Sequence, residues 1–185
     1  MKRVSVQGVP GSGKSTFGRA LAARLGAPYT ELDALYWGPD WRAAAADEFA
    51  ARVAALVAAD RWVIDGRYHG ALGDLVIARA DTVVWLDYPI RIWLPRLVRR
   101  TIRRMVLREE LWSGNRERLR TVLLERPSLF EWAWRKHHAD RTFVPRWVGA
   151  HPDVRLVRLP NPRAARRFLA AIEQNRAHEP AQGLR

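Results

Sequence analysis

The feature that most constrains the fold is a glycine-rich loop near the amino terminus. Residues 8–16 read Gly-Val-Pro-Gly-Ser-Gly-Lys-Ser-Thr, and they match the phosphate-loop pattern G-x-x-x-x-G-K-S/T in full. An alternating apolar stretch at 2–7 precedes the loop, and apolar residues at helical spacing over 14–25 follow it. The pattern therefore predicts a strand, a phosphate-binding loop and a helix, with an ordinary glycine turn as the alternative.

The residue types in this loop suit a nucleoside triphosphate, which we expect to be ATP with Mg²⁺. Glycines let successive backbone N–H groups point at phosphate oxygens, and the positive end of the following helix adds to the attraction. We expect Lys14 to reach the β- and γ-phosphates and the Ser15 hydroxyl to bind the metal. The predicted nucleotide-binding residues are Gly8, Pro10, Gly11, Ser12, Gly13, Lys14, Ser15 and Thr16.

The rest of the chain alternates between strand and helix patterns. Further strands are predicted at 29–32, 62–64, 82–86 and 154–159, and further helices at 47–60, 90–107, 131–141 and 162–175. Pro95 is expected to kink the helix predicted at 90–107 or to mark its start near Leu94. The alternation predicts a three-layer α/β P-loop fold with a five-stranded parallel sheet. We expect one domain over 1–175 and a disordered tail over 176–185.

Composition excludes several classes of protein. With 185 residues and 48% hydrophobic content, the chain can bury a substantial core. It contains no cysteine, which excludes disulfides and cysteine-ligated zinc. The first residues resemble a strand and not a signal peptide, and no apolar run is long enough to span a membrane. We therefore expect a cytoplasmic protein without a membrane partner.

The positive charge allows two interpretations. The formal net charge is +13, and residues 91–120 hold ten arginines against three glutamates, a net +7. Such charge could bind nucleic acid without sequence specificity. However, arginine is equally suited to the phosphates of a nucleotide. DNA is therefore a possible partner that the sequence does not favour.

Acidic residues follow three of the predicted strands. Asp33, Asp65 and Asp87 each come after an apolar run, at the edge where open α/β sheets bind ligands. Such a carboxylate could hold magnesium or orient a substrate hydroxyl, although capping of the next helix is about equally common. Asp65 is the strongest candidate because Gly66 follows it and permits close approach of a phosphate or a substrate.

Two further segments have alternative explanations. The aromatic segment 32–41, which includes Trp37, could stack on a planar substrate or fill the core under a loop, and the second is slightly favoured. Arg96, Arg100 and Arg103 recur at helical spacing and could converge on one anion or form a solvated face. The pair His137-His138 lacks an acid at metal-ligand spacing and is interpreted as structural or surface-exposed.

With these motifs in place, the chain resembles the adenylate-kinase-like P-loop kinases, and within them most closely the bacterial topology modulation proteins. The resemblance runs from Val4 to about Val144. Besides the phosphate loop, it rests on Leu-Asp-x-Leu-x-Trp at 32–37, Trp-x-Ile-Asp-Gly-x-Tyr at 62–68 and Ala-Asp-Thr-Val-x-x-Leu-Asp-Tyr-Pro at 80–89.

The resemblance implies roles for particular residues. The magnesium-linked carboxylate of the group falls on Asp65, and its triphosphate-binding arginines fall on Arg96 and Arg100. A short arginine-rich lid is implied at about 105–120. Nucleoside monophosphate kinases carry Phe-Pro-Arg after the Asp-Gly, whereas Arg67-Tyr68-His69 stands here, a departure from the monophosphate site.

The leading hypothesis is ATP- and magnesium-dependent transfer of a phosphoryl group to a small-molecule acceptor. Lys14, Asp33, Arg96 and Arg100 are the predicted catalytic residues, with Asp33 orienting or deprotonating the acceptor hydroxyl. The predicted metal ligands are Ser15 and Asp65. The predicted substrate-binding residues are Asp33, Trp37, Asp65, Gly66 and Arg67. The rival hypotheses are a nucleotide-switched DNA-binding protein and a regulatory NTPase whose only acceptor is water.

Overall fold

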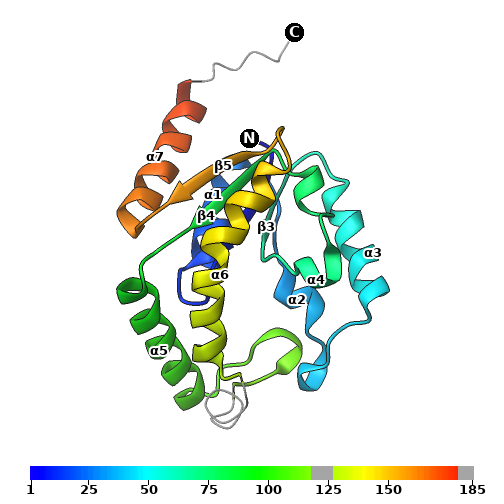
Figure 1. The fold of residues 1–185 in the computed structure, drawn as a ribbon, viewed down its shortest axis with the longest axis vertical. Coiled ribbons are helices and arrows are strands. Elements are labelled where there is room, and N and C mark those ends of the chain that lie inside the picture. Colours follow the sequence, from blue (N-terminus) through cyan, green and yellow to red (C-terminus); the bar gives the residue numbers. More distant parts are fainter. Residues whose placement is uncertain (118–126, 179–185) are drawn as a thin grey trace.

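The computed structural model describes residues 1–117 and 127–178. Its centre is a five-stranded parallel sheet with strand order β2-β3-β1-β4-β5, shown in Figure 1. The strands are β1 (Arg3–Gly8), β2 (Tyr29–Glu31), β3 (Trp62–Asp65), β4 (Thr82–Leu86) and β5 (Arg155–Leu159). The predicted fold class, including the number of strands, is therefore confirmed.

Helices connect the strands and cover the sheet. The longer ones are α1 (Lys14–Leu25), α3 (Ala46–Val57), α5 (Ile90–Val106), α6 (Leu129–Gly149) and α7 (Pro162–His178). Two short helices, α2 (Leu32–Tyr36) and α4 (His69–Leu72), follow β2 and β3. Single 3₁₀ turns lie at η1 (Pro39–Trp41), η2 (Ile77–Arg79) and η3 (Trp112–Gly114).

Alternating strand residues divide the core between the two faces of the sheet. On one face, Val4, Val6 and Val84 pack with residues of α1 and α7. On the other face, Ile64 packs with α3 and α4, and Trp85 packs with α6. In Figure 1, α6 crosses in front of the sheet and α1 lies behind it. This three-layer arrangement places the carboxyl ends of β1, β2 and β3 side by side.

Two of the predicted helices contain a proline. The helix predicted at 90–107 covers Ile90–Val106 with Pro95 inside it, so the alternative that Pro95 marks its start near Leu94 is wrong. The helix predicted at 131–141 instead covers Leu129–Gly149 and continues through Pro145. Ser128 begins it by accepting a hydrogen bond from the Glu131 backbone N–H at 3.2 Å. Buried Val144, Trp147 and Val148 hold its last turns against β4.

The predicted lid and tail are only partly covered. Of the lid at about 105–120, residues 118–120 lie outside the described part of the chain. Helix α7 extends to His178, and the remainder of the predicted tail, 179–185, lies outside the described residues. Within 1–117 and 127–178, no helix is long and apolar enough to cross a membrane.

Candidate active site

The phosphate loop connects β1 to α1 with the geometry that its sequence predicts. Gly13, at φ 88° and ψ 26°, precedes the first residue of α1 in a left-handed conformation that glycine tolerates. The Ser12 hydroxyl donates to the Val9 carbonyl at 2.7 Å and closes the turn. Lys14 Nζ lies 3.4 Å from the same carbonyl oxygen. The lysine side chain is thus folded back over the loop where a phosphate group would lie.

Gly11 explains why the loop packs tightly against α5. Its φ is 80°, and a Cβ atom built there would lie 2.4 Å from the Trp93 carbonyl oxygen. No side chain fits at that separation, so glycine permits the first turns of α5 to lie directly against the phosphate loop. Trp93 itself is fully buried beside Val9. The loop is therefore held between the sheet and α5.

Oxygens from three elements converge at the start of α1. Ser15 Oγ lies 2.7 Å from Glu31 Oε1 and 2.9 Å from Asp65 Oδ2. The Tyr29 hydroxyl also donates to Asp65 Oδ2 at 3.1 Å. A serine hydroxyl has one proton and can serve only one of the two carboxylates at a time. The three contacts between these oxygens are thus served by only two hydroxyl protons, those of Ser15 and Tyr29. A cation bound among the oxygens would reduce the repulsion between them.

The electrostatics of Asp65 fit a metal ion. Burial raises the pKa of Asp65 above its usual range, the charge of Lys14 and the Ser15 hydrogen bond lower it, and Glu31 and Asp33 raise it. Mg²⁺ prefers oxygen ligands and is commonly held by one or two carboxylates together with substrate phosphates. Within the described residues, no group of three or more His, Cys, Asp or Glu could hold a metal. The Ser15 hydroxyl and the Asp65 carboxylate are oxygen donors of the kind that suits Mg²⁺, and their role as metal ligands stays a prediction.

Sequence reasoning missed Glu31. The predicted strand 29–32 placed Asp33 directly after the strand, but β2 ends at Glu31 and Asp33 belongs to the first turn of α2. Glu31 is paired in register with Asp65 of the neighbouring strand, which brings the two acids together. Its carboxylate also forms an ion pair with Arg19 at 3.3 Å. The sequence does place an acid, Glu31, at the end of β2. That acid could have been identified as a site residue only with the knowledge that β2 lies beside β3.

Asp33 lies near this oxygen cluster and contacts a residue from the other side of the site. The Tyr68 hydroxyl donates to Asp33 Oδ1 at 2.5 Å. The negative charge of Asp33 also influences Asp65 and Arg100. Asp33 and Asp65 are therefore neighbours, although Asp33 lies in the first turn of α2 and not directly after β2.

Arg67 belongs to a charged cluster that sequence reasoning did not foresee. Its Nη1 lies 2.8 Å from Asp140 Oδ1, and Lys136 Nζ lies 2.9 Å from Asp140 Oδ2. Burial lowers the pKa of Lys136 to about 8, Asp140 opposes that shift, and the charges of Arg67 and Lys14 add to it. The Arg67 guanidinium also stacks over the Phe143 ring at 4.2 Å. Two cations here share one buried carboxylate, near the phosphate-loop lysine.

The structure separates the two arginines that were predicted to bind the triphosphate. Arg96 is exposed, and its charge acts on Tyr88. Arg100 is half-buried, and burial lowers its pKa while Glu117, Asp33 and Glu31 act in the opposite direction. Its Nε is buried without an acceptor among the described residues. Arg100 is therefore the arginine of this pair that faces the acid cluster.

The described part of the predicted lid is bound to the loop that follows α2. Asn115, which is buried, accepts from the Trp41 backbone N–H at 2.9 Å and donates to the Gly38 carbonyl at 2.8 Å. The Ser113 hydroxyl donates to the Trp37 carbonyl at 2.9 Å. The Trp41 ring lies 6.3 Å from that of Trp112, edge to face. We call the contact of η3 and Asn115 with η1 the latch.

Trp37 has a structural environment. Its ring is half-buried, 4.9 Å from Tyr36 and 5.8 Å from Trp41, with edge-to-face geometry in both pairs. This environment matches the favoured alternative, in which the aromatic segment packs under a loop. Stacking of Trp37 on a substrate stays a prediction.

Two other candidates from the sequence have structural partners. Asp87 is buried and pairs with Arg158, whose Nε lies 2.9 Å away, and with Arg141 at 3.4 Å. These ion pairs join β4 to β5 and α6. His137 is buried against Trp93, with ring centroids 5.6 Å apart. Asp87 thus has a structural environment but does not cap α5, whose first residue follows Pro89, and His137 fits its structural interpretation.

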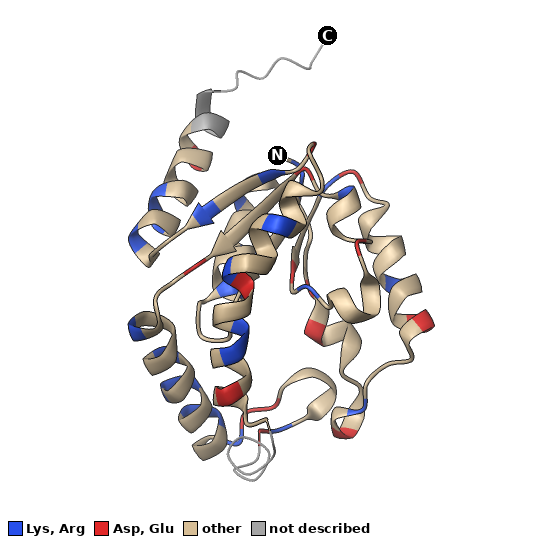
Figure 2. Cartoon of the chain, in the orientation of Figure 1, with Lys and Arg blue, Asp and Glu red and all other residues tan. Residues whose placement is uncertain are grey.

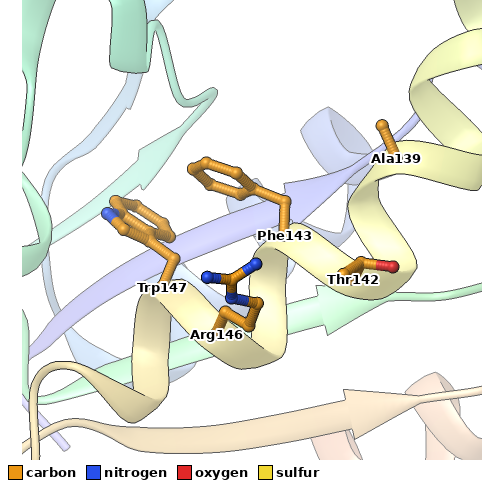
Figure 3. Close-up of a pocket in the computed structure, with 5 residues that line it drawn as sticks. All are labelled: Ala139, Thr142, Phe143, Arg146 and Trp147. Atoms are coloured by element: carbon orange, nitrogen blue, oxygen red, sulfur yellow. The ribbon is translucent and has the colours of Figure 1, made fainter.

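A hollow beside α6 lies outside the phosphate loop and the group of acids. It measures about 480 Å³ and is lined by Ala139, Thr142, Phe143, Arg146 and Trp147, all shown in Figure 3. None of these residues belongs to the phosphate loop or to the group of acids. The link to the site is Phe143, because its ring lies under the Arg67 guanidinium.

Comparison with known proteins supports the fold. Among solved structures, the chain is similar to shikimate kinase from Acinetobacter baumannii in complex with shikimate, with a TM-score of 0.55, 18% identity, and coverage of 98% of this chain and 96% of that one. It is also similar to shikimate kinase from Bacteroides thetaiotaomicron, with a TM-score of 0.54, 13% identity, and coverage of 95% and 98%. For shikimate kinase from Aquifex aeolicus the TM-score is 0.53 at 18% identity, with 95% and 99% covered.

Comparison of the amino-acid sequence with protein families and with curated proteins gives no match. The specific resemblance to topology modulation proteins therefore depends on the quoted motifs alone. The five-stranded parallel sheet, the phosphate loop and the similarity to solved kinases together show that this chain has the P-loop kinase fold.

Proposed function

We propose that this protein transfers a phosphoryl group from ATP, with Mg²⁺, to the hydroxyl group of a small-molecule acceptor. The observation that carries the proposal is the position of Ser15, the second residue of α1, within 2.9 Å of both Glu31 and Asp65. This contact joins a phosphate loop to a pair of carboxylates at adjacent strand ends. Phosphoryl transfer depends mainly on positioning and on electrostatic stabilisation, which such a site supplies.

The proposed roles follow from position and charge. Lys14 and Arg100 stabilise the negative charge that develops on the transferred group, and Arg96 contacts the triphosphate from the exposed side of α5. Ser15 and Asp65 hold Mg²⁺, which supplies charge neutralisation at the phosphates when it is bound. Asp33 orients the acceptor hydroxyl and takes up its proton.

The charged cluster around Asp140 favours an acceptor with an acidic group. Arg67 and Lys136 carry two positive charges against one carboxylate. An alcohol with a carboxylate or phosphate would balance the excess charge and place its hydroxyl toward Asp33. Shikimate, the ligand named for one solved neighbour, belongs to this chemical class. Gly66 and Trp37 are the proposed neighbours of the acceptor on the remaining sides.

An acceptor panel tests the proposal. Formation of ADP from ATP and Mg²⁺ is measured alone and with nucleosides, nucleoside monophosphates, sugar phosphates, hydroxy acids and neutral alcohols. We expect one acidic alcohol to stimulate ADP formation and to become phosphorylated, as detected by mass spectrometry. Phosphate release at one unchanged rate with every compound would instead support a regulatory NTPase.

Lys14→Ala is the first test of the phosphate loop. The lysine is half-buried at the loop surface and outside the core clusters, so we expect an intact fold. Loss of a cation that acts on the transferred phosphoryl group should reduce turnover by at least about 100-fold. Turnover is measured in the acceptor assay, and calorimetry reports both the fold and ATP binding. Turnover at the parent rate would show that the phosphate-loop assignment is wrong.

The resemblance to topology modulation proteins leaves DNA binding as the second candidate, supported by the net charge of +13. It predicts affinity for duplex DNA that falls steeply as salt increases. The phosphate loop would then serve as a switch. The cytoplasmic location stays a prediction under either function.

A further inference from the structure

Tyr68 has an unusual backbone conformation for an aromatic residue. Its φ is 47° and its ψ is 37°, in the left-handed region, immediately before α4. A non-glycine residue in such a conformation is strained and persists only where its surroundings fix it. In the sequence, only Arg67 separates Tyr68 from the Asp65-Gly66 pair. The strain therefore lies at the edge of the candidate active site.

The side chain of Tyr68 explains what fixes this conformation. Its ring lies 4.4 Å from the Tyr36 ring and 5.2 Å from the Phe49 ring, between α2 and α3. Its hydroxyl lies 2.5 Å from Asp33 Oδ1, a length typical of a hydroxyl donating to an ionised carboxylate. Asp33 and Tyr36 are three residues apart on α2 and so lie on one face of that helix. The packed ring thus delivers the hydroxyl to Asp33 in a single orientation.

Tyr68 can act only as a donor toward Asp33. Burial raises the pKa of Tyr68 above its usual range, and the charge of Asp33 raises it further, while a hydrogen bond with the Trp37 side chain acts in the opposite direction. The phenol therefore stays protonated wherever the enzyme would be assayed. The other charged groups that face Asp33 are Asp65 at the end of β3 and Arg100 on α5. Among the described residues, no hydrogen-bond donor reaches Asp33 Oδ2.

We propose that Tyr68 is a positioning residue, which holds Asp33 by Oδ1 so that Oδ2 faces the acceptor hydroxyl. The inference rests on the proposed function, in which Asp33 receives that hydroxyl. In the transfer step, the acceptor oxygen forms a bond to the γ-phosphorus while the bond from phosphorus to the β,γ-bridging oxygen breaks. ADP leaves with the bonding electron pair, and the acceptor proton moves to Asp33 Oδ2. Tyr68 keeps its own proton throughout.

The test compares two tyrosines of the same aromatic cluster. Tyr68→Phe keeps the ring and removes the hydroxyl that contacts Asp33, whereas the control Tyr36→Phe removes a hydroxyl without that contact. We expect Tyr68→Phe to lower kcat about 10- to 100-fold, with the KM for ATP within about twofold of the parent value. Tyr36→Phe should leave both constants within about twofold. Equal kcat values for the two variants would overturn the proposal.

A double-mutant cycle with Asp33→Asn shows whether Tyr68 acts through Asp33. If it does, adding Tyr68→Phe to Asp33→Asn lowers kcat by no more than about twofold further. Independent, multiplying losses would contradict the proposal.

The parent, the three single variants and the two double variants with Asp33→Asn are also unfolded in urea, which requires no acceptor. A coupling between Tyr68→Phe and Asp33→Asn that is absent between Tyr36→Phe and Asp33→Asn supports the contact. Additive effects overturn it. If no acceptor is phosphorylated while the coupling is present, the proposed function fails and the Tyr68–Asp33 positioning contact stands.

Discussion

The Asp65 side chain has opposite requirements for stability and for metal binding, because folding favours its protonated form and Mg²⁺ requires its ionised form. Its folded pKa is raised mainly by burial, so folding favours the protonated carboxyl. The stability it contributes is fully present below its unfolded pKa and is lost as pH rises through the folded pKa. Near pH 7, and without metal, this carboxyl therefore destabilises the fold relative to a neutral group of the same shape.

Asp65→Asn should accordingly separate stability from activity. Without Mg²⁺ at pH 7, we expect a higher Tm by differential scanning calorimetry, at about 2–4 °C for each kcal/mol of relief. Magnesium-dependent turnover should fall by about 100-fold or more, while ATP affinity measured without metal changes little. The gain in Tm should vanish at about pH 3, where the parent carboxyl is protonated too. Equal losses of nucleotide affinity with and without Mg²⁺ would indicate a purely structural role.

Lys136 should give the reaction an alkaline limit. Its pKa, lowered by burial to about 8, means that its charge is lost as pH rises through that value. The kcat/KM for an acidic acceptor reports the free enzyme and should therefore fall about tenfold for each pH unit above 8. Lys136→Arg keeps the charge at high pH and should abolish this fall in kcat/KM. With a neutral acceptor, kcat/KM should show no such alkaline limb in either protein. A limb that persists in Lys136→Arg would assign it to another group.

At the scale of elements, the latch couples the predicted lid to the loop on the acceptor side. Asn115 accepts from the Trp41 amide and donates to the Gly38 carbonyl, so η3 and η1 are held together by backbone groups. Ser113 extends the contact to the Trp37 carbonyl. Any movement of 111–115 during turnover would then also displace the loop beside Tyr68 and Asp33.

Asn115→Ala tests the latch in solution by hydrogen exchange. Loss of one hydrogen bond worth about 0.5–1.5 kcal/mol should speed exchange of the Trp41 amide about 2- to 10-fold. The Val63 amide, which donates to the Pro28 carbonyl at 2.9 Å, serves as an internal control and should not change. Ser113→Ala should leave the Trp41 amide nearly as protected as in the parent. Unchanged exchange in Asn115→Ala would mean that η3 moves independently of η1.

The elements show what the sequence could predict and what it could not. The phosphate loop and the five strands follow from local patterns, because continuous apolar runs and a glycine-rich loop each have few structural solutions. The exact end of β2 does not, because a three-residue strand offers almost no periodicity. That single uncertainty hid Glu31, whose pairing with Asp65 depends on the strand order.

Long-range contacts limit prediction of the site itself. The pair Arg67 and Asp140 is separated by 73 residues, and Tyr68 and Asp33 by 35. Asp140 resembles any surface acid of a helix until α6 is placed across the sheet. Arg100 was predicted from spacing, but only the packing of α5 distinguishes it from the exposed Arg96.

On the scale of the whole molecule, basic residues are unevenly distributed. Figure 2 shows Lys and Arg along α5, α6, β5 and α7, whereas the half that contains α3 and α4 carries several acids. The basic residues behind the net charge of +13 are therefore concentrated on one part of the molecule. Either rival function could use it, since a basic face attracts nucleotides as well as duplex DNA.

Two adjacent arginines of α5 can distinguish a basic face that serves catalysis from one that binds duplex DNA. Arg100 is half-buried and faces Asp33 and Glu31, whereas Arg99 is exposed on the same helix. Charge that serves catalysis must lie at the reacting phosphates, so we expect Arg100→Ala to lower turnover by about 100-fold and Arg99→Ala to leave it within about twofold. Charge that serves DNA must be accessible to the phosphate backbone, so Arg99 would matter more there than Arg100.

Duplex binding, measured by fluorescence anisotropy from 50 to 200 mM salt, completes the comparison. A protein that neutralises phosphates with Arg99 should lose about 0.9 from the slope of log affinity against log salt when that residue becomes alanine. For a kinase whose basic face serves nucleotides, we expect weak duplex binding with the same slope in both variants. Tight duplex binding at physiological salt, weakened by Arg99→Ala, together with full turnover in Arg100→Ala, would establish the nucleic-acid function in place of the kinase.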